Sequence, residues 1–122
     1  MNILYVGQYR DRGLDGKISR DYLELLIECG YNISALPIQT TKSINNLSDN
    51  ILGVEKNRFK TKPDLVIQSV PPEMIVKCDT KSIGIYNIAQ LRDKNEALKK
   101  VDLLDGFISP TIIDNPKITY IY

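Results

Sequence analysis

The sequence has 122 residues, with 16 basic and 15 acidic side chains and a formal net charge of +1 at pH 7. This length is enough for about one domain, which would bury roughly two-thirds of the surface that its unfolded chain exposes. Because the charges nearly balance and form no block of one sign, we expect no binding surface for nucleic acid or another polyanion.

The amino-acid composition argues against several kinds of catalytic or metal site and against export or membrane insertion. Histidine is absent, which removes mechanisms that need an imidazole and most zinc chemistry. The two cysteines, Cys29 and Cys78, form no CxxC pair, so we expect both to be reduced and predict no metal site. With no run of about 18 apolar residues and no export-signal pattern, we predict no transmembrane segment and a cytoplasmic location.

Short apolar runs alternate with segments of helical spacing along the chain. In order, we predict a strand at 3–6, a helix at 18–29, a strand at 33–38, a short helix ending at 55, strands at 65–68 and 82–86, a charged helix around 91–101, and strands at 106–108 and 117–122, the last as an edge strand.

Helix boundaries are predicted from capping residues. Asp15 is placed to cap the first long helix, and Gly30 suits the left-handed position just past its end. Ser48 or Asp49 would cap the short helix that follows the second strand.

Strands that alternate with helices indicate βαβ units with right-handed crossovers. We therefore predict an α/β fold in which residues 1–122 form a single Rossmann-like domain, with one open parallel sheet of five to six strands and helices on both faces. Ligands of such sheets bind beyond the carboxyl ends of the strands, where the strand order reverses. If the first strand lies between the second and third, the loops after Val6 and Gln68 face each other there.

The loop after the first strand is rich in glycine and polar side chains, with Gly7, Tyr9, Arg10, Arg12, Gly13 and Gly16. Its glycine spacing fits neither GxGxxG nor a Walker loop. The loop leads into a helix N-terminus, whose free N–H groups favour an anion or a sugar hydroxyl, so its residues are candidate ligand contacts. The alternative is that the glycines only permit a long strand-to-helix turn.

Two further segments supply candidate ligand contacts. Pro71 and Pro72 fix the exit of the third strand and could aim Glu73 at the mouth of the crevice, to hold hydroxyl groups or act as a base. Alternatively, the prolines start a helix with Glu73 in its first turn. Asn87, at the end of the fourth strand, could hydrogen-bond a polar ligand or be an ordinary loop residue.

Four segments, MNILYVGQY, SRDYLELLIECGYNISALPI, KPDLVIQSVPPEMI and KSIGIYNIAQL, resemble in order the N-terminal domain of GT-B glycosyltransferases of the group 1, retaining kind, over roughly residues 1–110. The resemblance implies an acceptor-side domain of an enzyme that transfers a sugar from a nucleotide-sugar donor. It further implies that the loop from Gly7 to Gly16 lies near the donor diphosphate and the acceptor, and that Pro71, Glu73 and Asn87 line the acceptor side.

The sequence departs from this pattern in two ways. Asn87 stands where related sequences often carry histidine, and the C-terminal donor-binding domain is absent from these residues. The resemblance therefore implies little or no turnover by this chain alone, with a sugar or glycan acceptor and a separate donor-binding domain or chain as partners. A nucleotide-sugar would serve as donor substrate, no other cofactor is expected, and no catalytic residue is assigned.

Two other readings compete with the glycosyltransferase half. A non-catalytic α/β module for binding or regulation would keep the same scaffold, since fold alone does not determine function. A receiver-like domain of flavodoxin type is disfavoured, because Gln68 and Ser69 stand where a phosphoacceptor aspartate would lie.

Overall fold

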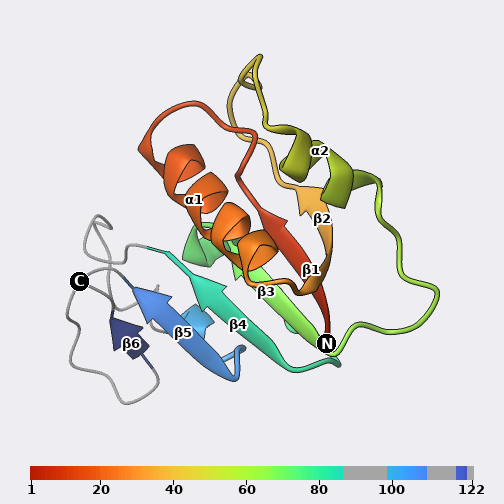
Figure 1. Ribbon diagram of the computed structural model, residues 1–122. Coiled ribbons are helices and arrows are strands. Elements are labelled where there is room, and N and C mark those ends of the chain that lie inside the picture. Colours follow the sequence, from red (N-terminus) through yellow and green to blue (C-terminus); the bar gives the residue numbers. More distant parts are fainter. Residues whose placement is uncertain (87–98, 110–117, 121–122) are drawn as a thin grey trace.

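The computed structural model describes residues 1–86, 99–109 and 118–120. Its elements are β1 (Asn2–Gly7), α1 (Leu14–Glu28), β2 (Asn32–Pro37), α2 (Asp49–Lys56), β3 (Leu65–Ser69), the 3₁₀ turn η1 (Pro72–Met74), β4 (Ser82–Ile85), β5 (Gly106–Ser109) and β6 (Ile118–Tyr120). Six strands form one parallel sheet in the order β2-β1-β3-β4-β5-β6 (Figure 1). The predicted α/β fold is confirmed.

The strands carry an apolar core on each face of the sheet. One core lies beneath α1, which crosses the sheet in Figure 1, and consists of Ile3, Tyr5, Tyr9, Leu23, Ile33, Ala35, Ile51, Ile67 and Ile85. The other consists of Val70, Ile75, Val101, Leu104 and Phe107. Phe107 pairs with Gly84, one position before Ile85, and successive strand side chains point to opposite faces. The helical residues 99–101 thus pack on the face away from α1.

The short helix α2 closes the β2 end of the sheet. Its N-cap is Ser48, whose hydroxyl accepts a hydrogen bond from the Ile51 amide at 3.3 Å, which confirms one of the two predicted caps. Beyond the helix, the side chain of Asn57 donates to the Ile33 carbonyl at 2.7 Å, and the Ser34 hydroxyl donates to the Asn57 carbonyl. These contacts satisfy polar groups along β2 that would otherwise form an open edge.

The start of α1 differs from its prediction. The helix begins at Leu14 and not at residue 18, and its N-cap is Gly13, with φ 89°, so the prediction that Asp15 caps the helix is wrong. Gly13 can take this left-handed backbone without steric cost, and Asp15 then falls in the first turn, where the helix dipole favours an acidic side chain. Gly30 has φ 85° just past the helix, as predicted.

Several other local predictions are confirmed. The last described strand, β6, is an edge strand, and β1 lies between β2 and β3. Glu73 lies inside the single 3₁₀ turn that Pro72 begins, which corresponds to the local alternative given for the two prolines. Of the charged helix predicted around residues 91–101, residues 91–98 lie outside the described part of the chain.

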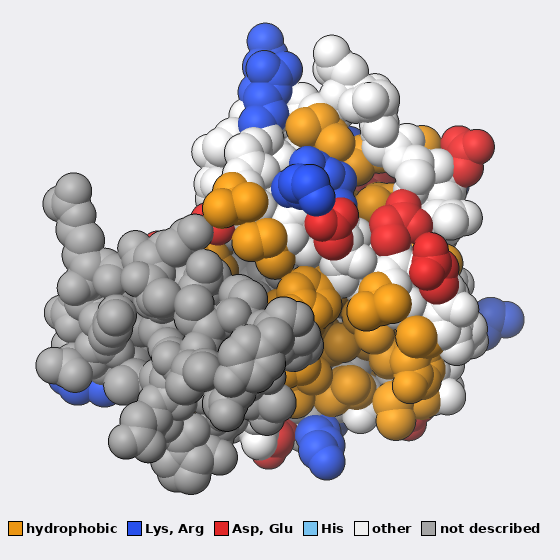
Figure 2. Space-filling view, turned by 60° about the vertical axis from the view of Figure 1, so that its left-hand side comes forward, with side chains coloured by type: hydrophobic (Ala, Val, Ile, Leu, Met, Phe, Trp, Pro, Cys, Tyr) orange, Lys and Arg blue, Asp and Glu red, His pale blue; other side chains and the backbone are white. Residues whose placement is uncertain are grey.

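Charged and apolar side chains share the surface beside α1. Figure 2 shows basic and acidic side chains close to one another on this face, with hydrophobic side chains gathered below them. Two leucines of α1, Leu14 and Leu25, are more than half exposed. No helix in residues 1–86 or 99–109 has both the length and the apolar character needed to cross a membrane.

Candidate functional site

A crevice lies at the carboxyl edge of the sheet, where the order of the strands reverses. Because β1 pairs with β2 on one side and β3 on the other, the segments that follow these three strands emerge together. The amide of Gln8 donates to the Ser69 carbonyl, and the amide of Ile38 donates to the Gly7 carbonyl. These bonds join the three strand ends at the place where ligands of open parallel sheets bind.

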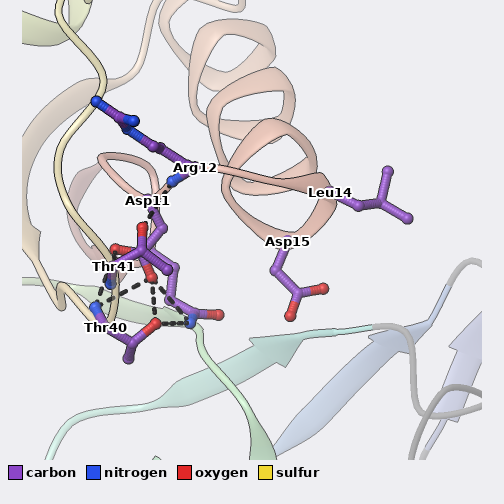
Figure 3. A pocket seen from close by; sticks show the side chains of 7 residues that line it. Asp11, Arg12, Leu14, Asp15, Thr40 and Thr41 are labelled. Atoms are coloured by element: carbon purple, nitrogen blue, oxygen red, sulfur yellow. Dashed lines mark hydrogen bonds between the residues drawn. The ribbon is translucent and has the colours of Figure 1, made fainter.

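A pocket of about 250 Å³ lies in this crevice, in front of the first turn of α1 (Figure 3). It is lined by Gln8, Asp11, Arg12, Leu14, Asp15, Thr40 and Thr41. Its walls therefore come from the loop after β1, the helix that follows it, and the segment after β2. The volume is well above the roughly 10–15 Å³ that a single water needs.

Asp11 is the buried centre of the pocket wall. Its carboxylate accepts hydrogen bonds from the Thr40 amide at 2.9 Å, the Thr40 hydroxyl at 2.5 Å and the Thr41 amide at 3.2 Å. The side-chain amide of Gln8 donates to the same carboxylate at 3.2 Å. Burying a carboxylate is tolerated when several donors surround it, so Asp11 fixes the segment after β2 against the loop after β1.

The predicted site residues Tyr9 and Arg10 are directed toward α2. The Tyr9 hydroxyl donates to Glu55 at 2.8 Å, and the Arg10 guanidinium donates to both oxygens of that carboxylate at 2.6 Å. The hydrogen bonds from Arg10 hold the pKa of Glu55 below its usual value. Burial, followed by the Glu55 carboxylate, raises the pKa of Tyr9. Both side chains anchor the loop, and neither lines the pocket.

The predicted site residues Gly7 and Gly16 lie where the loop and α1 pack most closely. A Cβ at Gly16 would lie 1.9 Å from the Asp11 carbonyl oxygen, and one at Gly7 would lie 2.8 Å from the Ser19 hydroxyl. The same Asp11 carbonyl accepts a hydrogen bond from Arg20 at 2.7 Å. Glycine at position 16 therefore lets the backbone of Asp11 lie directly on the helix.

Arg12 lines the pocket and is exposed. Its backbone amide donates to the Thr41 hydroxyl at 2.8 Å, while its guanidinium makes no hydrogen bond or ion pair with the described residues. Figure 3 shows the Arg12 side chain extending away from Asp15 and the Asp11 carboxylate turned toward Thr40 and Thr41. The basic group is thus at the rim of the pocket and free to contact a ligand.

A second polar contact joins the end of β4 to the first turn of α1. The Tyr86 hydroxyl, from the end of β4, donates to Asp15 at 3.1 Å. Burial raises the pKa of Tyr86 to about 12, and the nearby carboxylates of Asp15 and Glu73 add to this effect. Glu73 is exposed on the turn that follows Pro71. The structure therefore brings Tyr86 and Asp15 into contact at the carboxyl edge of the sheet.

The predicted residues are brought together only in part. Arg12 lines the pocket, Glu73 lies near Tyr86, and Pro71 precedes the turn that carries Glu73, whereas Asn87 lies outside the described residues. The sequence reasoning missed seven lining or neighbouring side chains, namely Gln8, Asp11, Leu14, Asp15, Thr40, Thr41 and Tyr86. The polar run that follows the second apolar strand was the available signal, because such a run emerges at the same sheet edge as the first loop.

Comparison of the chain with protein-family models, with curated proteins and with solved structures found no match. Both cysteines are free, Cys29 at the surface and Cys78 partly buried. Within the described ranges, no cluster of three or more aspartate, glutamate or cysteine side chains has the arrangement of a metal site.

Proposed function

We propose that this domain is the acceptor-side half of a glycosyltransferase and binds a sugar or glycan acceptor in the crevice at the carboxyl edge of its sheet. The observation that carries the proposal is the 3.1 Å hydrogen bond from the Tyr86 hydroxyl to Asp15. This bond joins the end of β4 to the first turn of α1, which directly follows the opening loop, and it supports a shared crevice for these segments. These are the segments on which the resemblance to group 1 enzymes rests.

The chemistry of these side chains suits the recognition of hydroxyl groups. One oxygen of Asp15 accepts the Tyr86 hydroxyl, and the other has no partner within the described residues. A carboxylate with a free oxygen accepts a hydrogen bond from a sugar hydroxyl, and a charge-assisted bond of this kind is stronger than a neutral one. Glu73, exposed on the turn that follows Pro71, is a second carboxylate that we propose can hold a hydroxyl or act as a base.

The described residues of the crevice do not supply a complete binding site for a nucleotide-sugar donor. Sugar transfer requires the leaving diphosphate to be neutralised as well as the acceptor hydroxyl to be held in line. Arg12 is the basic residue among those that line the pocket, and a nucleotide diphosphate would meet Asp15 at the same wall. We therefore infer that a separate domain or chain supplies the donor site and that this chain alone has little or no turnover.

Saccharide binding by the isolated chain tests the proposal. We expect a panel of mono- and oligosaccharides to include at least one that shifts the backbone amide NMR signals of Leu14 and Asp15. Asp15→Ala should weaken this binding by roughly tenfold, because the carboxylate bond is lost. Asp21→Ala, which removes an equal charge from an exposed ion pair with Lys17 on the same helix, should leave binding unchanged.

A second experiment separates an enzyme half from a binding module. The chain is mixed with donor-binding domains of retaining glycosyltransferases, and cleavage of nucleotide-sugars is measured. Turnover that depends on both components supports the enzyme half. Saccharide binding without turnover in any mixture would instead identify a non-catalytic binding module, and a chain that binds no saccharide of the panel at this edge would refute the proposal.

A further inference from the structure

The inner wall of the pocket is the side chain of Gln8, which directly follows β1 and is only 4% exposed. Its amide nitrogen donates to Asp11 at 3.2 Å and to the Thr40 hydroxyl oxygen at 3.2 Å. A side-chain amide has two hydrogens on its nitrogen and no donor on its oxygen. Both donors of Gln8 are thus used by the wall itself.

Asp11 determines which way this amide faces. A carboxylate can only accept hydrogen bonds, and the Thr40 hydroxyl already donates its hydrogen to Asp11 at 2.5 Å. If the Gln8 amide were turned by half a rotation, its oxygen would meet two oxygens that offer it no hydrogen. The hydrogen-bond network therefore fixes the amide orientation, with the Gln8 oxygen on the side away from Asp11.

The oxygen of Gln8 opens into the pocket. It has no hydrogen-bond partner in residues 1–86, 99–109 or 118–120, since the other hydrogen bonds of Gln8 are made by its side-chain nitrogen and its backbone, whose carbonyl accepts from the Asp11 amide at 2.8 Å. Yet no fully buried polar side-chain atom of the described chain is left without a partner. The oxygen is therefore in contact with solvent. Because the rest of Gln8 is buried, we infer that its oxygen reaches solvent through the pocket that Gln8 lines.

The first turn of α1 contributes donors to the same pocket. The first helical hydrogen bond runs from the Lys17 amide to the Gly13 carbonyl at 3.1 Å, and Gly13 supplies no side-chain cap. The amides of Leu14, Asp15 and Gly16 therefore have no acceptor within the helix. Leu14 and Asp15 line the pocket together with Gln8.

A hydroxyl group fits this combination of acceptor and donors. It can donate to the Gln8 oxygen and accept from a free amide of the helix. A phosphate is an anion with mostly acceptor oxygens, so beside the basic Arg12 at the rim it would also meet the oxygens of Gln8 and Asp15. An ammonium group only donates and is disfavoured by the positive end of the helix dipole. We propose that Gln8 is a specificity-determining residue and Asp11 its positioning residue in a subsite for a neutral, hydroxyl-bearing ligand. The identity of that ligand as a glycosyl acceptor rests on the proposed function.

Substitution of Asp11 by asparagine tests the positioning role. The asparagine oxygen would keep the bonds from the Thr40 and Thr41 amides, so its nitrogen would face Gln8 and turn the Gln8 amide over. In the wild type, we expect the side-chain amide hydrogens of Gln8 to exchange slowly with water. In Asp11→Asn they should exchange at least roughly tenfold faster, because the amide nitrogen now faces the pocket.

Ligand selectivity should change with the orientation. Methyl glycosides, myo-inositol and inorganic phosphate serve as probes, with the amide NMR signals of Leu14 and Asp15 as readout. The wild type should respond to at least one neutral probe and not to phosphate. Asp11→Asn should bind that probe roughly tenfold more weakly and gain a response to phosphate. Asp21→Asn, with the same loss of charge at an exposed site, should behave as the wild type.

The outcomes separate this inference from the proposed function. Fast exchange of the Gln8 amide in the wild type, or equal selectivity of the wild type and Asp11→Asn, overturns the inference and leaves saccharide binding intact. A fixed amide without a response to any neutral probe overturns the ligand class and the proposed function together. If Asp11→Asn fails to fold, Gln8→Met takes its place, and unchanged binding of the neutral probe by that variant refutes the role of Gln8.

Discussion

Two glycines that both lie inside helices should respond oppositely to alanine. Gly16, in the first turn of α1, is covered by the loop after β1, whereas Gly53, in α2, has nothing within 4 Å of the position that a Cβ would occupy. Alanine favours a helix over glycine by about 1 kcal/mol at either site. We predict that Gly16→Ala destabilises the domain and that Gly53→Ala stabilises it.

The size of the Gly16→Ala effect follows from the distance to the loop. The Asp11 carbonyl oxygen lies 1.9 Å from the ideal Cβ, so reaching a normal C···O separation of about 3.3 Å requires a shift of about 1.4 Å. Overpacking of this kind costs about 1–3 kcal/mol. The shift also removes the 2.7 Å hydrogen bond from Arg20 to that carbonyl, at a cost of about 1 kcal/mol. After the gain in helix propensity, the net loss is about 1–3 kcal/mol.

Thermal unfolding followed by circular dichroism measures both effects. At about 4 °C per kcal/mol for a domain of this size, Gly16→Ala should lower Tm by about 4–12 °C and Gly53→Ala should raise it by about 4 °C. Urea unfolding should rank the variants in the same order. A Gly16→Ala protein as stable as the wild type would refute the placement of the loop on α1, and a Gly53→Ala protein that is less stable would refute the open surroundings of Gly53 in α2.

Three further predictions concern stability. Arg10 lowers the pKa of Glu55, so the stabilisation from this pair is complete above the ordinary value of 4.5 and is lost as pH falls through the lowered pKa. Glu55→Gln should cost about 2–3 kcal/mol near neutral pH and flatten the acid side of the stability profile in urea unfolding, whereas an unchanged profile contradicts the role of the pair. Because the pKa of Tyr86 is raised to about 12, its contribution is complete below the free-phenol value of about 10 and is lost between these two pH values. Tyr86→Phe should make alkaline unfolding less steep, and an identical profile speaks against burial of the phenol beside Asp15. Ser48→Ala removes the N-cap of α2 and should lower the free energy of unfolding by about 1 kcal/mol in the same assay. Unchanged stability would show that Ser48 does not cap the helix in solution.

The strands could be predicted from the sequence because their apolar runs meet a simple condition. Consecutive apolar residues are typical of strands in a parallel sheet covered on both faces, and β1 and β3 contain such runs, although every second side chain of β1 is only half-buried. The left-handed backbone of Gly30 and the N-cap role of Ser48 could also be predicted, since each residue acts on its own neighbours in the chain. Apolar runs, turn residues and capping residues are local signals, and together they are enough to predict the order of strands and helices along the chain.

The candidate site depends on hydrogen bonds between residues that are far apart in the sequence. Asp11 and the Thr40 amide are 29 residues apart, and Arg10 and Glu55 are 45 apart. Whether a polar loop residue faces a ligand or a neighbouring element is decided by what packs beside it, so the sequence predicts Arg10 as a ligand contact and gives no reason to select Asp11. The start of α1 differs from the prediction for a related reason, since the close approach of the Asp11 carbonyl to Gly16 joins residues of the loop and the helix in a way that local spacing does not reveal.

The position of β1 in the sheet has a consequence for the rate at which the chain folds. Asn2 must meet Asn32, 30 residues away, and Asp64, 62 residues away, before the sheet is continuous. Doubling a loop adds only about 0.6 kcal/mol of closure entropy, so neither encounter is strongly favoured over the other. Because every described strand pair is parallel and its strands are joined by a crossover, contacting residues are far apart in the sequence and the contact order is high. We expect it to fold more slowly than a helical bundle of equal length.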